Sequence, residues 1–122
     1  MLAKINRLKK KADFDRVFKA GKGFKNGFLY FKIARNNLTV NRFGFIVGKK
    51  FSLKATLRNR VKRKITEVVR IISPRLKKGA DVVVIVLPGF QANDIWELKM
   101  MVENIFKKSG VLKDENSKKD IS

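Results

Sequence analysis

The segment from Leu57 to Ile72 constrains the fold and the function of this chain more than any other. Its apolar residues recur at spacings of three and four, which is the pattern of one face of an α-helix. These residues are Leu57, Val61, Ile65, Val68, Val69 and Ile72. The opposite ridge carries Asn59, Arg63, Thr66 and Arg70, with Arg58, Arg60, Lys62 and Lys64 on its flanks. One side of the helix can therefore pack against a sheet while the rest presents cationic groups.

Acidic residues are missing over the long stretch of the chain that ends at Thr66. From Arg16 to Thr66 there are 15 lysines and arginines and no aspartate or glutamate, and the whole chain has a net charge of +20. A basic run usually marks a solvated face, but ordinary solvated helices mix both signs because like charges repel. The excess favours a polyanionic partner, with nucleic acid first and an anionic membrane second. Nucleic acid is preferred, because the charge is spread along the chain and not gathered on one amphipathic helix.

The length of 122 residues suits one domain with a single core. No apolar run approaches the ~20 residues that cross a bilayer, and the N-terminus lacks the apolar segment of a secretory signal. The absence of cysteine fits a reducing cytosol, so we expect a cytoplasmic protein without membrane contact. Residues 1–110 are expected to form the domain, opening with a basic arm over 1–11. Residues 111–122 lose periodicity and are expected to be a disordered tail.

The other segments predict an α+β domain. A short helix over 12–20 is stopped by Gly21 in the position usual for a C-terminal glycine, and a short edge strand is expected near Phe24. Residues 28–34 and 42–48 alternate as strands, and the β-branched run 81–87 is typical of a strand buried on both faces. Asn93 or Asp94 caps a last helix, whose predicted core residues are Ile95, Trp96, Leu98, Met101, Val102, Ile105 and Phe106. The order of helix, two or three strands, helix, strand and helix indicates a sandwich of helices over one small sheet.

Aromatic residues beside the charge indicate a surface for single strands. Phe14 and Phe18 are four apart and share a helix face; burial in the core is the commoner fate of any one phenylalanine, but this helix is too short to bury every ring. In the strand over 28–34, Leu29, Phe31 and Ile33 form a core face. The other face carries Phe28, Tyr30 and Lys32, which suits nucleotide stacking. Gly44 and Gly48 on one face of the next strand allow a backbone or a ligand to approach closely.

The chain lacks the groups that catalysis needs. It has no histidine and no cysteine, which excludes Ser-His and Cys-His nucleophile systems. Its ten acids do not cluster as a metal-dependent nuclease requires, and neither GxxxxGK[ST] nor GxGxxG occurs. We therefore expect no catalytic residue and no metal site in the protein, and assign any catalytic groups to a partner.

The segment GFIVGKKFSLKATLRNRVKRKITE, residues 44–67, resembles the protein subunit of bacterial ribonuclease P. It carries Gly-Phe-x-Val-x-Lys-Lys, then Ala, then Arg-Asn-Arg-x-Lys-Arg. The segment RLKKKADFDRVFKAG, residues 7–21, resembles the pattern near the front of the same family. The resemblance covers nearly the whole chain except the tail, and the arginine motif in its strand-loop-helix context is highly specific.

The resemblance implies an αβββαβα fold, a single-domain α/β sandwich akin to domain 2 of ribosomal protein S5. Its crossover between parallel strands would be left-handed, against the general rule. It implies a protein that binds a large catalytic RNA, which removes the 5′ leader of precursor tRNA with Mg²⁺ held mainly by the RNA and the substrate. The implied partners are that RNA and precursor tRNA, and no protein partner is required.

The resemblance also implies two sets of site residues. The set that meets the catalytic RNA is Arg58, Asn59, Arg60, Lys62, Arg63 and Lys64. The set that lines a cleft for the single-stranded leader is Phe14, Phe18, Phe28, Tyr30, Lys32, Lys49 and Lys50. Many relatives have an arginine at the position of Thr66, so a contact made by that arginine requires Lys64 or Arg70 as a substitute here.

Two alternatives compete with this interpretation. A structural protein that binds ribosomal RNA would have the same charge and a similar fold, and only the Arg-Asn-Arg motif in its context separates the two. A stand-alone nuclease is disfavoured by the missing histidine and the scattered carboxylates.

Overall fold

The computed structural model describes residues 2–90 and 94–113, so Asn93 and residues 114–122 of the expected tail lie outside the described residues. The helices are α1 (Lys11–Ala20), α2 (Ala55–Ile72) and α3 (Ile95–Lys108), with short 3-10 helices η1 (Lys4–Asn6) and η2 (Ser73–Arg75). The strands are β1 (Lys22–Asn26), β2 (Leu29–Arg35), β3 (Arg42–Val47) and β4 (Ala80–Val86). This order confirms the expected αβββαβα fold.

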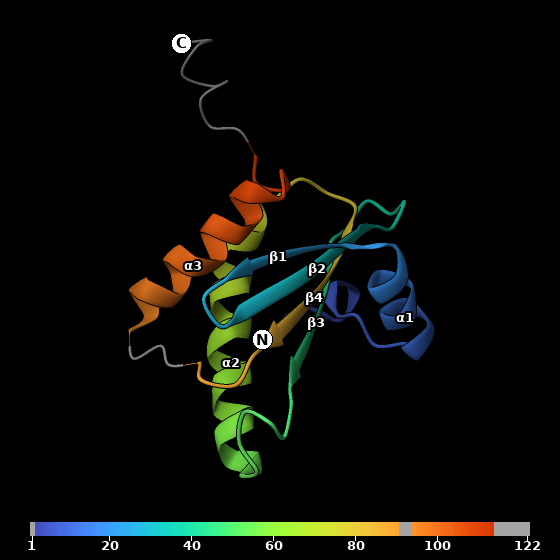
Figure 1. Ribbon diagram of the computed structural model, residues 1–122. Coiled ribbons are helices and arrows are strands. Elements are labelled where there is room, and N and C mark those ends of the chain that lie inside the picture. Colours follow the sequence, from blue (N-terminus) through green and yellow to red (C-terminus); the bar gives the residue numbers. More distant parts are fainter. Residues whose placement is uncertain (1, 91–93, 114–122) are drawn as a thin grey trace.

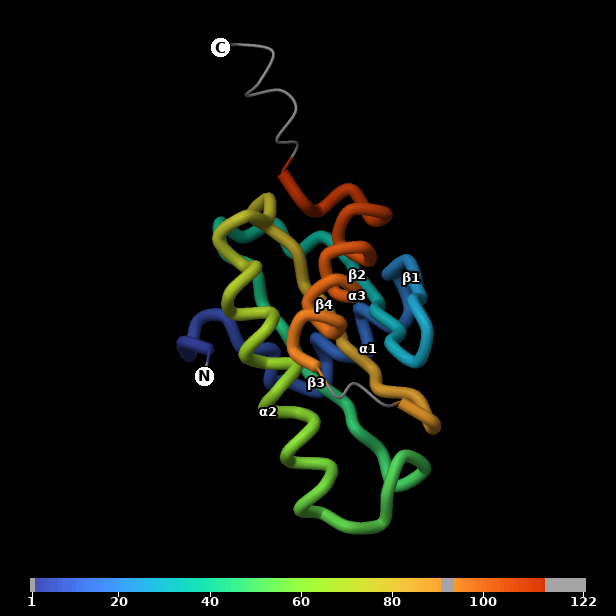
Figure 2. The backbone as a smooth tube through the Cα atoms, turned by 90° about the vertical axis from the view of Figure 1, so that its left-hand side faces the viewer, coloured from blue at the N-terminus to red at the C-terminus, as the bar shows by residue number. Residues whose placement is uncertain are grey.

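The four strands form one mixed sheet in the order β1-β2-β4-β3. β2 is antiparallel to both of its neighbours, whereas β3 and β4 are parallel. β4 is therefore a central strand, as its β-branched run predicts, and Val82, Val83 and Val84 are fully buried. α2 crosses over from β3 to β4 in front of the sheet in Figure 2, and the strand order makes this crossover left-handed.

The helices cover the two faces of the sheet unequally. α2 and α3 lie on one face, and α1 lies on the other (Figure 1). The larger core lies beneath α2 and α3, where the Phe106 ring meets the rings of Phe31 and Phe43 edge to face at centroid distances of 5.3 and 6.4 Å. Such aromatic pairs stabilise a core beyond the area that they bury. A smaller core of Leu8, Val17 and Val83 lies beneath α1.

The predicted core of the last helix is wrong at two positions. Ile95 and Trp96 are 53% and 66% exposed, whereas Leu98, Val102, Ile105 and Phe106 are buried. The first turn of α3 precedes Leu98, the first of its residues to reach the core. Leu57 is exposed for a related reason, because the first turns of α2 extend past the end of the sheet (Figure 1). Asp94 caps α3 as predicted, accepting a hydrogen bond from the Trp96 amide at 2.8 Å.

Both ends of the described chain are attached to the domain. The Leu8 amide donates to the Phe43 carbonyl at 2.9 Å, so the expected basic arm runs along the outer edge of β3, with Leu2 and Leu8 buried. At the other end, the Lys77 amide donates to the Val111 carbonyl at 2.7 Å, and the Lys113 amide donates to the Arg75 carbonyl at 2.9 Å. Residues 111–113 thus continue the fold past Gly110, while the boundaries of the domain stay a prediction.

Gly21 stops α1, but not by the expected geometry. Its φ of −76° is ordinary extended backbone and not the left-handed conformation of a C-terminal glycine. The position requires glycine for space, because a Cβ atom there would lie 2.4 Å from the Val17 carbonyl oxygen. Among the described residues, no helix has both the length and the apolar character needed to cross a membrane.

Candidate nucleic-acid interface

α2 carries all six residues that the resemblance assigns to the catalytic RNA. Arg58 is half-buried and donates from Nη1 to the Ser52 carbonyl at 2.9 Å, which ties the helix to the loop before it. The other five side chains are exposed. They divide into two groups, because Asn59, Lys62 and Arg63 line a groove against β3, whereas Arg60 and Lys64 are four apart and share a different side of the helix.

Four exposed cations of α2 are not neutralised by the described part of the protein. Within residues 2–90 and 94–113, no carboxylate lies within ion-pair distance of Arg60, Lys62, Arg63 or Lys64. Concentrated like charge on a helix costs stability, so this surface favours an anionic partner.

The side chains around Thr66 are already engaged. The Thr66 hydroxyl donates to the Lys62 carbonyl at 2.7 Å, and Arg70 Nε donates to both Glu67 oxygens at 3.1 and 3.2 Å. Hydrogen bonding from Arg70 lowers the pKa of Glu67, and the same contact raises the pKa of Arg70. Of the two residues able to substitute for an arginine at Thr66, Lys64 is therefore the one without an acidic partner among the described residues.

The face of the sheet beneath α1 is open at one end only. Its rows across β2, β4 and β3 are Ala34–Asp81–Arg42, then Lys32–Val83–Gly44, then Tyr30–Ile85–Ile46. Val17 of α1 covers the middle row, where Val83 is fully buried. The third row is only half-buried, and we name its residues Tyr30, Ile46 and Ile85 the open strand face.

The predicted leader-binding residues come from α1, from β2 and from the loops at the end of the sheet. Phe18 is 40% exposed and belongs to neither core. Burial, which is the commoner outcome for a phenylalanine, therefore does not apply to it. Lys32 donates to the Gly21 carbonyl at 3.3 Å, and the Tyr30 hydroxyl lies over Gly23. The predicted role of these side chains in leader binding stays a prediction.

Three further members of the predicted set lie near the end of the sheet where β3 and β4 finish. Phe28 precedes β2, and its ring lies against Gly89, just after β4. Lys49 and Lys50 are exposed in the turn after β3. The parallel direction of β3 and β4 places these cations and the Phe28 ring at one end of the open strand face.

Phe14 lies one turn before Phe18 on α1, near β3. Its ring rests on Gly44, where an added Cβ atom would lie 2.4 Å from a ring carbon. The close approach at this glycine is made by the side chain of Phe14 and not, as expected, by a backbone or a ligand. Phe14 also lines the groove beside α2. Phe14 thus belongs to the groove as well as to the helix face that it shares with Phe18.

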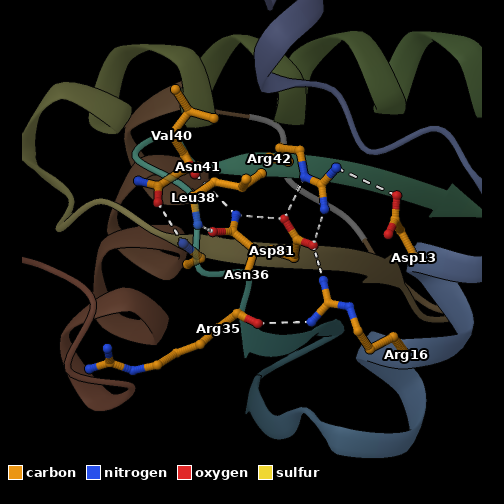
Figure 3. Close-up of polar contacts among 10 residues, drawn as sticks. Asp13, Arg16, Arg35, Asn36, Leu38, Val40, Asn41, Arg42 and Asp81 are labelled. Atoms are coloured by element: carbon orange, nitrogen blue, oxygen red, sulfur yellow. Dashed lines mark hydrogen bonds and ion pairs between the residues drawn. The ribbon is translucent and has the colours of Figure 1, made fainter.

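Sequence reasoning missed the residue that holds α1 against the sheet. Asp81 is fully buried at the start of β4, and side chains from three other segments converge on it (Figure 3). Arg42 donates from Nε and Nη2 to its two oxygens at 2.8 and 2.6 Å, Asn36 donates from Nδ2 at 2.8 Å, and Arg16 of α1 donates from Nη2. Arg16 also donates to the Arg35 carbonyl at 2.8 Å.

Asp81 is ionised in this setting. Burial alone would raise its pKa, but the hydrogen bonds from Arg42 and Asn36 and the charges of Arg42 and Arg16 outweigh burial and hold the pKa below its ordinary value. The hydrogen bond to Asp81 likewise raises the pKa of Arg42. The network lies at the end of the sheet that α1 covers, and its bonds to Arg16 fix the position of α1 on the sheet.

Acidic side chains are scattered over the described part of the chain. Over residues 2–90 and 94–113, no three acidic side chains come close enough together to hold a metal. The buried carboxylate of Asp81 is saturated by cationic and amide donors.

Known proteins share both the fold and the sequence. A family model described as ribonuclease P matches residues 2–110. The ribonuclease P protein component of Clostridium acetobutylicum is 38% identical over 117 residues, covering 93% of this chain and 98% of the relative. That of Caldanaerobacter subterraneus is 36% identical, covering 94% and 98%.

Solved structures agree with these relatives. The RNase P protein of Staphylococcus aureus matches with a TM-score of 0.78 and 28% identity, covering 88% of this chain and 98% of the other. The RNase P protein of Thermotoga maritima matches with a TM-score of 0.75 and 33% identity, covering 84% and 96%. This chain therefore belongs to the family of bacterial ribonuclease P protein components, which serve as subunits of a tRNA-processing endoribonuclease.

Proposed function

We propose that this chain binds the catalytic RNA of ribonuclease P through α2 and the 5′ leader of precursor tRNA across the open strand face. By holding both, it assists the Mg²⁺-dependent hydrolysis that releases the mature 5′ end of the tRNA. One observation carries the proposal. Four exposed cations of α2, namely Arg60, Lys62, Arg63 and Lys64, have no acidic partner among the described residues, and the open strand face with its aromatic Tyr30 lies on the other side of the same sheet.

The two surfaces suit two kinds of RNA. Structured RNA is held largely through phosphates and 2′-hydroxyls, which match the arginines and lysines of α2. Single strands are gripped by aromatic side chains in a cationic groove. Phe18 and Tyr30 supply such rings, and Lys32, Lys49 and Lys50 supply cations nearby.

The chemistry belongs to the RNA in this proposal. The described part of the chain offers no cluster of metal ligands, so Mg²⁺ is expected on the catalytic RNA and the substrate. The protein contributes positioning and positive charge, which screens phosphates that metal ions would otherwise have to screen. A cytoplasmic location fits this role, since the chain has no cysteine that needs oxidation.

A reconstitution experiment tests the proposal. Purified protein is mixed with precursor tRNA at low Mg²⁺, with and without the catalytic RNA. We expect no cleavage by the protein alone, and faster cleavage with the RNA than the RNA achieves without the protein. Cleavage by the protein alone that survives nuclease-free repurification would contradict the proposal. Binding without any stimulation would favour a structural protein of ribosomal RNA.

The salt dependence of RNA binding tests the role of α2. The logarithm of the binding constant should fall linearly with the logarithm of salt concentration. Arg60→Ala and Arg63→Ala should each reduce the magnitude of that slope by about one unit, if each arginine contacts one phosphate. Lys107→Ala on α3 is the matched control and should leave the slope unchanged. Equal slopes in all four proteins would make the α2 charge an ordinary solvated face.

A further inference from the structure

A groove of about 830 Å³ opens between the N-terminal segment, the outer edge of β3 and α2. Its volume lies within the ~300–1,000 Å³ that is typical of small-ligand sites. None of the functional assignments above accounts for a cavity here, although Asn59, Lys62 and Arg63 line it.

The groove has an apolar floor and a cationic rim. Phe14, Leu8 and Phe43 contribute to the floor, with the Phe14 ring held in place on Gly44. Four cations line the groove, namely Arg7, Lys9, Lys62 and Arg63, against the single carboxylate of Glu67. That carboxylate accepts hydrogen bonds from Arg70, so the electrostatic potential in the groove favours an anion.

The exposed edge of β3 adds one backbone hydrogen-bond donor and one backbone acceptor to the groove. The Phe43 carbonyl points outward, since it accepts from the Leu8 amide. Alternate residues of a strand direct their backbone groups to the same edge, so the Phe45 N–H and C=O also face outward, toward the groove that Phe45 lines. No hydrogen-bond partner for either group is found among residues 2–90 and 94–113.

We propose that this groove binds one unpaired nucleotide of the catalytic RNA. Its base would lie against Phe14 with its edge on the Phe45 backbone, and its phosphate would lie at the cationic rim. Each base presents neighbouring donor and acceptor atoms on its pairing edge, which a backbone N–H and C=O can match once the base is unpaired. A phosphate alone would leave the apolar floor and the strand edge without a partner. The inference rests on the proposed function and adds a base-binding site to it.

Thr66 allows the groove to be blocked without a change of charge. Its side chain lines the groove, is half-buried and is short. Thr66→Phe should fill the space that the base needs and weaken binding of the catalytic RNA by roughly 10-fold or more. The matched control is Thr56→Phe, the same change at an exposed position on the same helix and outside the groove. It should leave the affinity unchanged. Melting temperatures identify any loss of folding, and Thr66→Leu is the smaller replacement if the phenylalanine variant does not fold.

A second measurement uses small probes on the full chain. Adenosine monophosphate, cytidine monophosphate and ribose 5-phosphate are compared by equilibrium dialysis. The nucleotides should bind at least roughly 10-fold more tightly than ribose 5-phosphate, and Thr66→Phe should remove the difference. Equal binding of all three would overturn the proposal, because only phosphate would then be recognised.

The outcomes separate this inference from the proposed function. If Thr66→Phe folds and binds the catalytic RNA like the wild type while Arg63→Ala weakens binding, the groove is empty in the complex and the inference is wrong. If neither Arg60→Ala nor Arg63→Ala weakens binding, the proposed function of α2 itself is wrong.

Discussion

Replacing Asp81 with alanine is expected to lower the free energy of unfolding by about 3 kcal/mol, which is a large fraction of the ~5–15 kcal/mol that stabilises a typical domain. The change removes a fully buried carboxylate and leaves Arg16 and Arg42 facing an empty site. Breaking a buried ion pair on one side typically costs ~3–5 kcal/mol. The lower end applies here, since Arg16 and Arg42 are 38% and 22% exposed and can regain water.

Thermal unfolding measures this effect. The melting temperature of the Asp81→Ala variant should fall by roughly 10 °C. The matched control is Asp15→Ala, which removes an exposed carboxylate that has no ion pair within residues 2–90 and 94–113, and it should change the melting temperature little. Equal melting temperatures for the two variants would show that the Asp81 network adds no net stability.

The same network should make stability depend on pH in the acidic range. The folded pKa of Asp81 lies below its ordinary value of about 3.9. The stabilisation is therefore fully present above that ordinary pKa and is lost as the pH falls through the lower, folded pKa. Asp81→Asn cannot ionise, so the stability difference between the wild type and this variant should shrink as the pH falls through this window. A difference that is constant over the window would contradict an ionised Asp81.

Local patterns predicted most of the fold. The spacing of Ile65, Val68 and Val69 identified the buried face of α2, and the β-branched run identified β4 as a central strand. These two patterns predict correctly because each depends only on residues that are close in the chain. The hand of the crossover followed only from the family resemblance, since the general rule for parallel strands predicts the opposite.

The errors occur where an element passes the edge of its packing partner. Ile95, Trp96 and Leu57 continue an apolar pattern beyond the point where sheet or core remains to cover them. Periodicity reports which face of a helix is apolar, but it does not report where the neighbouring element ends. The N-terminal segment is a similar case, because its pairing with β3 depends on β3 being an edge strand.

The parts of the candidate site that sequence missed depend on distant residues. Arg16 and Asp81 are 65 positions apart, and Arg42 and Asp81 are 39 apart. A single aspartate at the start of a strand carries no sign of these partners before the sheet order is known. The groove beside α2 is also a product of assembly, since Lys9, Phe45 and Arg63 meet only when three segments pack together.

Replacing Phe18 with alanine is expected to weaken binding of precursor tRNA that bears a leader of several nucleotides by roughly 10-fold. Stacking of one base on an aromatic side chain is worth ~1–3 kcal/mol, which corresponds to about 5- to 150-fold in affinity. Phe18 can supply such a platform because it is 40% exposed and lies on α1, which covers the face of the sheet that carries Tyr30. Tyr30→Ala should have the same effect more weakly, since Tyr30 is half-buried.

The leader dependence separates stacking from a general loss of function. Affinities of the Phe18→Ala holoenzyme are measured for mature tRNA and for precursors with leaders of increasing length. Binding of mature tRNA and of the catalytic RNA should hardly change. The loss of affinity for precursor tRNA should grow as the leader becomes long enough to reach the open strand face. Arg60→Ala should behave in the opposite way, weakening assembly with the catalytic RNA whatever the leader.

Phe31→Ala provides the matched phenylalanine control. Phe31 is fully buried against Phe106, so its loss should cost ~3–5 kcal/mol of stability and lower every activity together. Phe18→Ala should melt close to the wild type, because the ring lies outside both cores. If Phe18→Ala instead loses as much stability as Phe31→Ala and shows no dependence on the leader, Phe18 packs the domain and does not bind the leader.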